Sequence, residues 1–168
     1  VLSQYNAPVE QVYGAIKAMG FSEIIEVAQG AMVTTDKETE EFKERMENGE
    51  PFMTTSCCPS YIEMAEKHIP ELKKYISTTK SPMYYTAEIA KDMYPGAKLV
   101  FIGPCIAKRK EALKHGNVDY VMTFEELNAA FEGMGIEIKE DQTYTVSHVS
   151  SRDAHGFAQT GGVTAAVV

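Results

Sequence analysis

Three cysteines are the residues of this sequence whose type and spacing are best suited to chemistry. Cys57 and Cys58 end a β-rich segment, residues 51–58, and Cys105 follows a nearly all-apolar segment, residues 98–103. Thiolates are soft ligands that hold iron–sulfur clusters and zinc. Because these cysteines are too few for a four-coordinate site, either its other ligands lie outside this chain or the cysteines bind no metal. In a further interpretation they are small buried hydrophobic residues.

Lys108 is a second candidate for chemistry. It lies three residues after Cys105, on the first turn of a predicted helix. Its ammonium group is either solvated or turned back toward the end of the strand as a hydrogen-bond donor to an anionic ligand. Alone it is weak evidence, but Pro104, Cys105 and Glu111 around it favour the second interpretation.

Two glutamates and two histidines complete the set of candidates. Glu38 and Glu41 are three residues apart, which places them on one face of a predicted helix. On a helix this acidic, a solvated face is the simpler interpretation. His148 and His155 fall in a segment with few structural signals, and the four histidines of the chain show no metal-ligand spacing.

The composition excludes several classes of function. The 168 residues carry 24 acidic and 16 basic side chains, a net charge of −8. Nucleic acids and membrane surfaces are polyanions, so we expect neither as a partner. Three cysteines argue against a disulfide framework, and no run of about 18 apolar residues is present to span a bilayer. Without a signal-peptide pattern, the sequence indicates a cytoplasmic unit taken from a longer protein.

Apolar patterns and turn residues predict strands that alternate with helices. Strands are expected at residues 21–28, 51–58, 98–103 and 119–122. Helices are expected at residues 7–19, 36–47, 60–76 with an interruption near Pro70, 83–94, 106–116, 124–135 and 163–168, with a loop at 139–155. Thr123 and Glu126 form a capping box. The pattern predicts one α/β lobe over residues 1–168, an open, mainly parallel four-stranded sheet flanked by helices.

The predicted sheet brings the cysteines together. Ligands of parallel sheets bind beyond the carboxyl ends of the strands. Since Cys58 and Cys105 each end or follow a strand, we expect both at the same rim of the sheet. Adjacent residues of a strand point to opposite faces, so Cys57 is free for a different role and should form no disulfide with Cys58.

The segments around the cysteines resemble the iron-only (FeFe) hydrogenases. Residues 55–59, T-S-C-C-P, match the first motif of that family, and residues 104–111, P-C-x-x-K-x-x-E, match the second. Residues 20–21 (G-F), 30–31 (G-A), 80–82 (K-S-P) and 160–163 (T-G-G-V) also fit, in the same order. The resemblance covers about the whole chain. It implies an oxidoreductase that interconverts protons and electrons with dihydrogen.

The resemblance also implies a cofactor, the H-cluster, in which a 4Fe-4S cubane is joined by a cysteine to a two-iron centre. By motif position, Cys58 and Cys105 are metal ligands, two of the four cysteines that hold the cubane. Cys57 is the cysteine that passes protons to the two-iron centre. Lys108, in the motif that begins at Pro104, donates to a cyanide of that centre. The outer positions of the proton relay fall near Glu38, Glu41 and Ser77.

The chain departs from the family pattern in places. The upstream lobe and the third motif, with the other two cysteine ligands, are absent from these 168 residues, so we expect no complete H-cluster on the isolated chain. The implied partners are the remaining lobe and ferredoxin-like iron–sulfur domains of the same polypeptide, and an electron donor such as ferredoxin. Gly103, Tyr61 and Ala165 replace a methionine, a tryptophan and a glutamate. Glycine before Pro-Cys resembles the hydrogen-sensing branch of the family.

Two other functions stay open. A non-catalytic, hydrogenase-like iron–sulfur scaffold of the kind used in cluster assembly would keep the ligands but lose the proton-shuttling residues. The presence of both Cys57 and Lys108 favours the hydrogenase over this scaffold. A plain interaction or structural domain with buried cysteines is the interpretation that the paired motifs support least.

Overall fold

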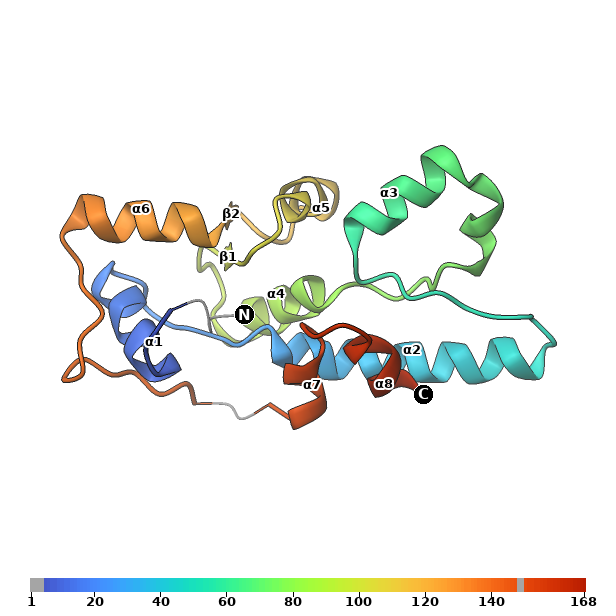
Figure 1. Ribbon diagram of the computed structural model, residues 1–168, viewed down its shortest axis with the longest axis horizontal. Helices are drawn as coiled ribbons and strands as arrows, with labels where there is room; N and C mark the ends of the chain where they lie inside the picture. Colours follow the sequence, from blue (N-terminus) through green and yellow to red (C-terminus); the bar gives the residue numbers. More distant parts are fainter. Residues whose placement is uncertain (1–4, 148–149) are drawn as a thin grey trace.

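The structure, a computed structural model, describes residues 5–147 and 150–168. Helices predominate, and the long helix α2 and the helix α4 beside it run through the middle of the molecule (Figure 1). The helices are α1 (Val9–Ala18), α2 (Ala28–Glu47), α3 (Pro59–His68), the 3-10 helix η2 (Pro70–Tyr75), α4 (Pro82–Met93), α5 (Ala107–His115), α6 (Phe124–Met134), α7 (Arg152–Gly156) and α8 (Gly162–Val167). The strands are β1 (Val100–Ile102) and β2 (Tyr120–Met122).

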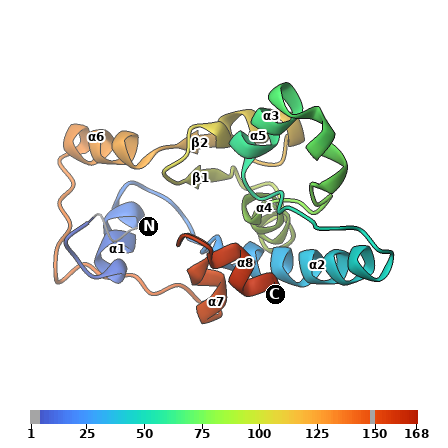
Figure 2. The ribbon, with the colours of Figure 1, turned by 45° about the vertical axis from the view of Figure 1, so that its right-hand side comes forward.

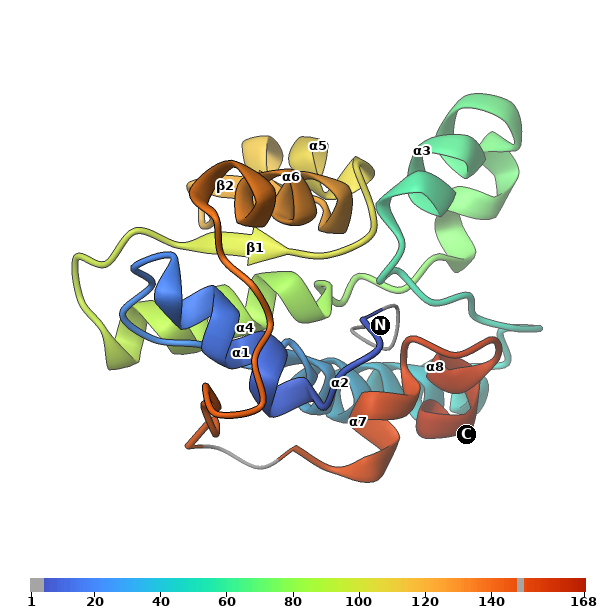
Figure 3. The ribbon, with the colours of Figure 1, turned by 60° about the vertical axis from the view of Figure 1, so that its left-hand side comes forward.

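The two strands form one parallel sheet. Val100 lies opposite Tyr120 and Ile102 lies opposite Met122, with α5 as the crossover between the strands. The sheet lies between α4 on one side and α5 and α6 on the other (Figure 3). The predicted strands 98–103 and 119–122 and their parallel pairing are therefore confirmed. The prediction of four strands is wrong, because the described residues contain a sheet of two.

Residues 21–28 do not form the predicted strand. The backbone of residues 21–27 is irregular, and α2 already begins at Ala28, eight residues before the predicted helix start. The apolar side chains of this run, Phe21 and Ile24, pack against the core between α1 and α6 without a partner strand.

Residues 51–58 are extended but belong to no sheet. Their one ladder contact in the described part of the chain is an isolated parallel bridge between Thr54 and Ile76. The Thr54 nitrogen donates to the Tyr75 oxygen and the Ser77 nitrogen donates to the Thr54 oxygen, both at 2.8 Å. Further along, the Ser56 nitrogen donates to the Glu38 carboxylate instead of to a strand. A buried side chain thus takes the place of a sheet partner.

A close crossing of α2 and α4 fixes the position of both helices. Gly30 lies where the helices touch, and a Cβ atom there would overlap the Pro82 carbonyl oxygen. The Gly30 nitrogen donates to Thr86 Oγ1 at 3.1 Å, and Thr34 Oγ1 donates to the Lys80 oxygen at 3.2 Å. These contacts hold the first turns of α2 against the start of α4 and the residues just before it.

Local signals in the sequence fix several helix ends. The capping box of α6 is confirmed, with Thr123 accepting from the Glu126 nitrogen at 3.2 Å and Glu126 accepting from the Thr123 nitrogen at 2.8 Å. The predicted interruption near Pro70 is confirmed as the change from α3 to η2. Most of the predicted loop 139–155 is irregular, but it ends in α7, which Ser151 caps.

The C-terminal helices α7 and α8 lie along α2 (Figure 2). His155 of α7 places Nε2 3.0 Å from Glu26, while His148 lies outside the described residues.

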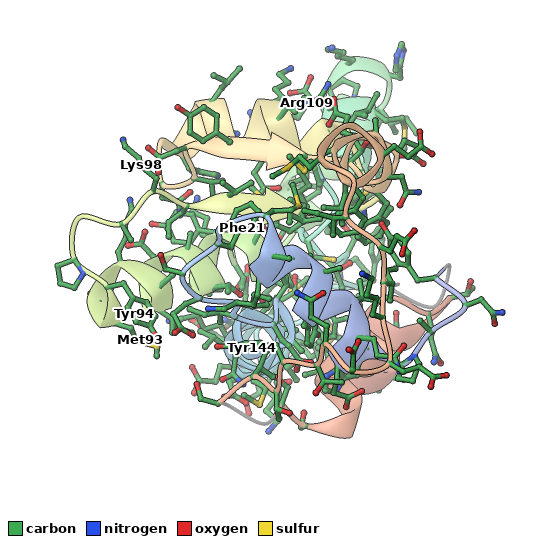
Figure 4. All side chains as sticks on the ribbon, turned by 90° about the vertical axis from the view of Figure 1, so that its left-hand side faces the viewer. Phe21, Met93, Tyr94, Lys98, Arg109 and Tyr144 are labelled. Atoms are coloured by element: carbon green, nitrogen blue, oxygen red, sulfur yellow. The ribbon has the colours of Figure 1, made fainter. Side chains whose placement is uncertain are left out.

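The main core joins α1 to α6, and a smaller one joins α4 and α5 to the sheet. Figure 4 shows Lys98 and Arg109 on the outside of the layer formed by the sheet and α5. None of the helices in residues 5–147 and 150–168 has the length and hydropathy to cross a bilayer.

Candidate functional site

Cys57 and Cys58 lie in the extended segment that leads into α3. Cys58 directly precedes α3, whose first residue, Pro59, needs no hydrogen-bond partner for its nitrogen. Cys57 is half-buried and Cys58 is exposed, which agrees with neighbours that point to opposite sides of an extended chain. Both are free thiols. Burial raises the pKa of the Cys57 thiol, the charge of Glu38 raises it further, and Lys108 opposes both. Cys57 therefore keeps its proton.

Lys108 connects the two cysteine motifs. Its ammonium group donates to the Cys57 carbonyl oxygen at 3.2 Å and to Glu111 Oε2 at 2.6 Å. The Ser81 hydroxyl donates to the other oxygen of Glu111. The side chains of Lys108 and Glu111 are 12% and 8% exposed, so this is a largely buried ion pair. Of the two sequence interpretations of Lys108, the structure supports a side chain turned back toward the first motif.

Cys105 follows β1 after a short turn, as predicted. Its thiol is free and half-buried, and Pro104 before it is exposed. Gly103 is buried under the ring of Phe101, two atoms of which would lie 2.7 Å from a Cβ at position 103. A side chain at position 103 therefore requires the Phe101 ring to move. The prediction of a common sheet rim is wrong in its premise, because residues 51–58 belong to no sheet in the described part of the chain and only Cys105 follows a sheet strand. The contact from Lys108 to the Cys57 carbonyl oxygen nevertheless joins the first motif to the helix that follows Cys105.

Glu38 is fully buried, so a solvated acidic face is the wrong interpretation for this residue. Its Oε1 accepts from the Ser56 nitrogen at 3.0 Å and from the Ser56 hydroxyl at 3.3 Å. Its Oε2 has no hydrogen-bond partner within the described residues. Burial raises the pKa of Glu38, against the opposing effects of Ser56 and Ser77. This carboxyl therefore holds a proton more readily than an ordinary glutamate.

Glu41, one turn further along α2, is held by many donors. Ser77 Oγ donates to Oε2 at 2.6 Å, and the Thr78 nitrogen lies 3.0 Å from both carboxylate oxygens. The Thr79 hydroxyl donates to Oε2 at 3.3 Å. Burial on its own would raise the pKa of Glu41, but hydrogen bonds from Ser77, Thr78 and Arg45 outweigh it and lower the pKa. The pKa of Glu38 is thus raised and the pKa of Glu41 is lowered relative to an ordinary glutamate, and Ser77 lowers both.

Arg45 is a residue of this site that the sequence reasoning missed. Its Nε and Nη2 donate to Glu41 Oε1 at 3.0 and 2.7 Å, and its Nη1 donates to Glu50 at 3.1 Å. Its spacing of four residues from Glu41 was the available signal, since such pairs meet on a helix. The sequence reasoning also missed Ser56, because nothing in its surroundings indicates that it contacts a helix 18 residues away.

The donor set fits one part of an iron–sulfur site. Cys58 and Cys105 offer two soft thiol ligands, which suit iron. No group of three or more histidine, cysteine, aspartate or glutamate side chains is arranged for a metal ion in the described ranges. Two thiols are of the right type for part of an iron–sulfur site and fall short of the four ligands that such a cluster needs.

The family of this chain follows from its sequence. A family model for the "Iron only hydrogenase large subunit, C-terminal domain" matches residues 2–168. The chain therefore belongs to the iron-only hydrogenase large-subunit family. It is similar to Iron hydrogenase 1 of Clostridium pasteurianum, at 32% identity over 177 residues that cover 94% of this chain and 31% of that protein.

Two further similarities bear on structure and on function. The fold resembles that of the apo FeFe-hydrogenase HydA1 from Chlamydomonas reinhardtii, with a TM-score of 0.75 and 29% identity over 83% of this chain and 40% of that chain. The sequence is also similar to the Cytosolic Fe-S cluster assembly factor NAR1 of Kluyveromyces lactis, at 28% identity over 127 residues, 74% of this chain and 26% of that protein. The chain thus spans about a third of the curated relatives' length.

Proposed function

We propose that this chain is part of an iron-only hydrogenase that catalyses the reversible reduction of two protons by two electrons to dihydrogen. The observation that carries this proposal is the buried Glu38 carboxyl, one oxygen of which has no hydrogen-bond partner among the described residues and whose charge raises the pKa of the Cys57 thiol. Burying a carboxyl group without a full set of partners is costly, so a protein keeps one where its proton is used. Membership in the hydrogenase family supports the same conclusion.

Cys58 and Cys105 would hold the H-cluster, with the other two cysteine ligands supplied from outside this chain. When bound, the cluster supplies the electrons and the iron at which protons and dihydrogen interconvert. Lys108 would orient the cluster by donating hydrogen bonds to a cyanide, and Pro104 would form part of the wall beside Cys105. Lys108 suits this role because Glu111 holds its ammonium group in place, charged and largely shielded from water.

The residues from Cys57 to Glu41 would carry protons. The Cys57 thiol keeps its proton until a stronger base nearby takes it, since its pKa is raised. Glu38 is the next group, and it is able to replace that proton because burial favours its neutral form. Ser77 interacts with both glutamates, and a hydroxyl passes a proton by donating one while accepting another. Glu41 is the outermost carboxylate of this relay, 15% exposed.

A scaffold for iron–sulfur cluster assembly is the second candidate, and the similarity to the assembly factor supports it. A scaffold needs ligands but no proton relay. Glu38, which Ser56 hydrogen-bonds, and Glu41, which Ser77 hydrogen-bonds, lie one turn apart on α2, and this pair of held carboxyl groups favours the hydrogenase, because a scaffold has no use for it. A hydrogen-sensing member of the family is compatible with the same residues, and Gly103 favours that form.

The proposal extends to partners and location. The remaining lobe and ferredoxin-like domains of the same polypeptide would enclose the cluster, and a ferredoxin would deliver electrons. We propose a cytoplasmic location, where free thiols such as those of Cys57, Cys58 and Cys105 stay reduced.

The experiment is maturation of the full-length protein that carries this chain, followed by infrared spectroscopy and assay of hydrogen turnover. A hydrogenase shows cyanide and carbonyl bands and evolves dihydrogen, and Cys58→Ala and Cys105→Ala remove both signals. Bound iron without cyanide or carbonyl bands would instead identify the scaffold.

A further inference from the structure

Arg45 lies between two carboxylates and uses every one of its N–H groups. Nε and one N–H of Nη2 bind Glu41, and one N–H of Nη1 binds Glu50. The remaining two donate to backbone carbonyls, Nη1 to Lys74 at 2.9 Å and Nη2 to Ile76 at 3.2 Å. A guanidinium group has five donors in a fixed plane, so five acceptors leave it a single orientation.

Glu50 is tied to Arg45 twice. Its side chain accepts from Nη1 at 3.1 Å, and its backbone nitrogen donates to the Arg45 carbonyl at 3.0 Å. Gly49, in the left-handed region at φ 79°, makes the turn that returns the chain to Arg45. The Glu50 side chain is 37% exposed, so its negative charge is held at the outer side of the guanidinium. Glu50 lies outside both cysteine motifs, and neither motif predicted a role for it.

We propose that Glu50 is a positioning residue that sets the proton affinity of Glu41, by sharing the positive charge of Arg45 with it. This inference rests on the proposed function, because the proton affinity of Glu41 matters to turnover only if Glu41 carries protons. With Glu50 in place, one guanidinium serves two carboxylates. Without the Glu50 charge, Arg45 acts on Glu41 alone and stabilises its ionised form too well for a proton carrier.

Other charged groups near Glu41 do not replace Glu50. Lys37, Glu40 and Glu44 of α2 and Tyr85 of α4 line a groove on the solvent side of Glu41, and Glu38 lies one turn back on the inner side. None of these is a hydrogen-bond partner of Arg45 among the contacts described above. The lowered pKa of Glu41 shows that the present balance already favours the carboxylate, although burial opposes it.

The test uses the metal-free full-length protein with 13C-labelled glutamate carboxyl groups. The Glu41 signal is assigned by its loss in Glu41→Gln, and its titration is followed by NMR in the parent protein and in variants. Glu50→Gln keeps the shape and an acceptor for Nη1 but removes the charge. We expect it to move the Glu41 midpoint to lower pH, with about threefold weaker proton binding, the effect of one charge several ångströms away near water. Glu47→Gln is the control, because this exposed glutamate of α2 is no partner of Arg45.

The titration midpoint of Glu41 in Glu50→Gln and in Glu47→Gln supports or overturns the inference. A midpoint that moves in Glu50→Gln and stays in Glu47→Gln supports the inference. An unchanged midpoint in Glu50→Gln, an equal change in both variants, or a move to higher pH would overturn it. If the midpoint moves as expected but Glu41→Gln leaves hydrogen turnover of the loaded enzyme intact, the inference on Glu50 stands and the proposed relay fails.

Discussion

Replacing Gly30 by alanine should separate α2 from α4 and destabilise the fold. A Cβ at this position would overlap the Pro82 carbonyl oxygen and the Thr86 hydroxyl and would lie 2.7 Å from the Thr86 nitrogen. Two of these three atoms belong to the backbone, so the helices must move apart. Overpacking of this kind costs about 1–3 kcal/mol. The hydrogen bonds from Gly30 to Thr86 and from Thr34 to Lys80 weaken as well, at about 1 kcal/mol each.

Alanine has a better helix propensity than glycine by about 1 kcal/mol, which offsets part of this loss. The net effect is a destabilisation of about 2–4 kcal/mol, which for a chain of this size lowers the melting temperature by about 5–15 °C. Thermal unfolding followed by circular dichroism measures it. Gly133→Ala in α6 is the matched control, since nothing lies within 4 Å of the added methyl group, and it should stabilise by about 0.5–1 kcal/mol. If Gly30→Ala were as stable as Gly133→Ala, the described helix crossing would be wrong.

Four further predictions concern three carboxylates and one helix cap. The pKa of Glu38 is raised in the folded protein, so its contribution to the free energy of unfolding decreases as pH rises above its unfolded pKa of about 4.5. Glu38→Gln should therefore remove a decrease of the urea unfolding midpoint that wild type shows over this pH range. Glu41 has a lowered pKa and should behave oppositely, so Glu41→Gln should remove a gain in stability that wild type shows as pH rises toward about 4.5. Glu111→Ala should cost about 3 kcal/mol by leaving Lys108 buried and unpaired, and Lys108→Met with Glu111→Leu should recover most of it in the same unfolding assay. Thr123→Ala should cost about 1 kcal/mol through the lost cap of α6, and a change below about 0.3 kcal/mol would contradict the capping box.

Local signals predicted the elements that depend on local contacts. The capping box of α6 and the interruption at Pro70 follow from residues close to one another in the chain, and β1 and β2 are apolar runs joined by a single crossover helix. Residues 21–28 and 51–58 have strand-like composition but no available strand partner. The first run is buried as irregular chain, and the second gives its Ser56 nitrogen to a carboxylate of α2. Composition cannot show such long-range contacts.

The candidate site likewise contains residues that short spacings in the sequence indicated and residues that only the fold reveals. The two cysteine motifs and Lys108 were recognisable from short spacings, and the structure brings their segments together. The burial of Glu38 was not recognisable, because an acidic helix face is usually solvated and only the fold shows that Ser56, itself bonded to Thr79, contacts this carboxyl. Arg45 and Glu50 were missed for a similar reason, since the turn at Gly49 that brings them together has no signal of its own beyond Asn-Gly.

The division of labour between Cys57 and Cys58 tests the proposed function most directly. In the full-length, matured protein, iron content, infrared bands and hydrogen turnover should be measured together for Cys57→Ser and Cys58→Ala. A proton carrier needs only a titratable group at the reacting site, whereas a ligand is bonded to iron. We expect Cys57→Ser to keep its iron and its cyanide and carbonyl bands while turnover falls by orders of magnitude, and Cys58→Ala to lose the cluster. Full turnover in Cys57→Ser, or iron lost there and retained in Cys58→Ala, would contradict the proposed roles.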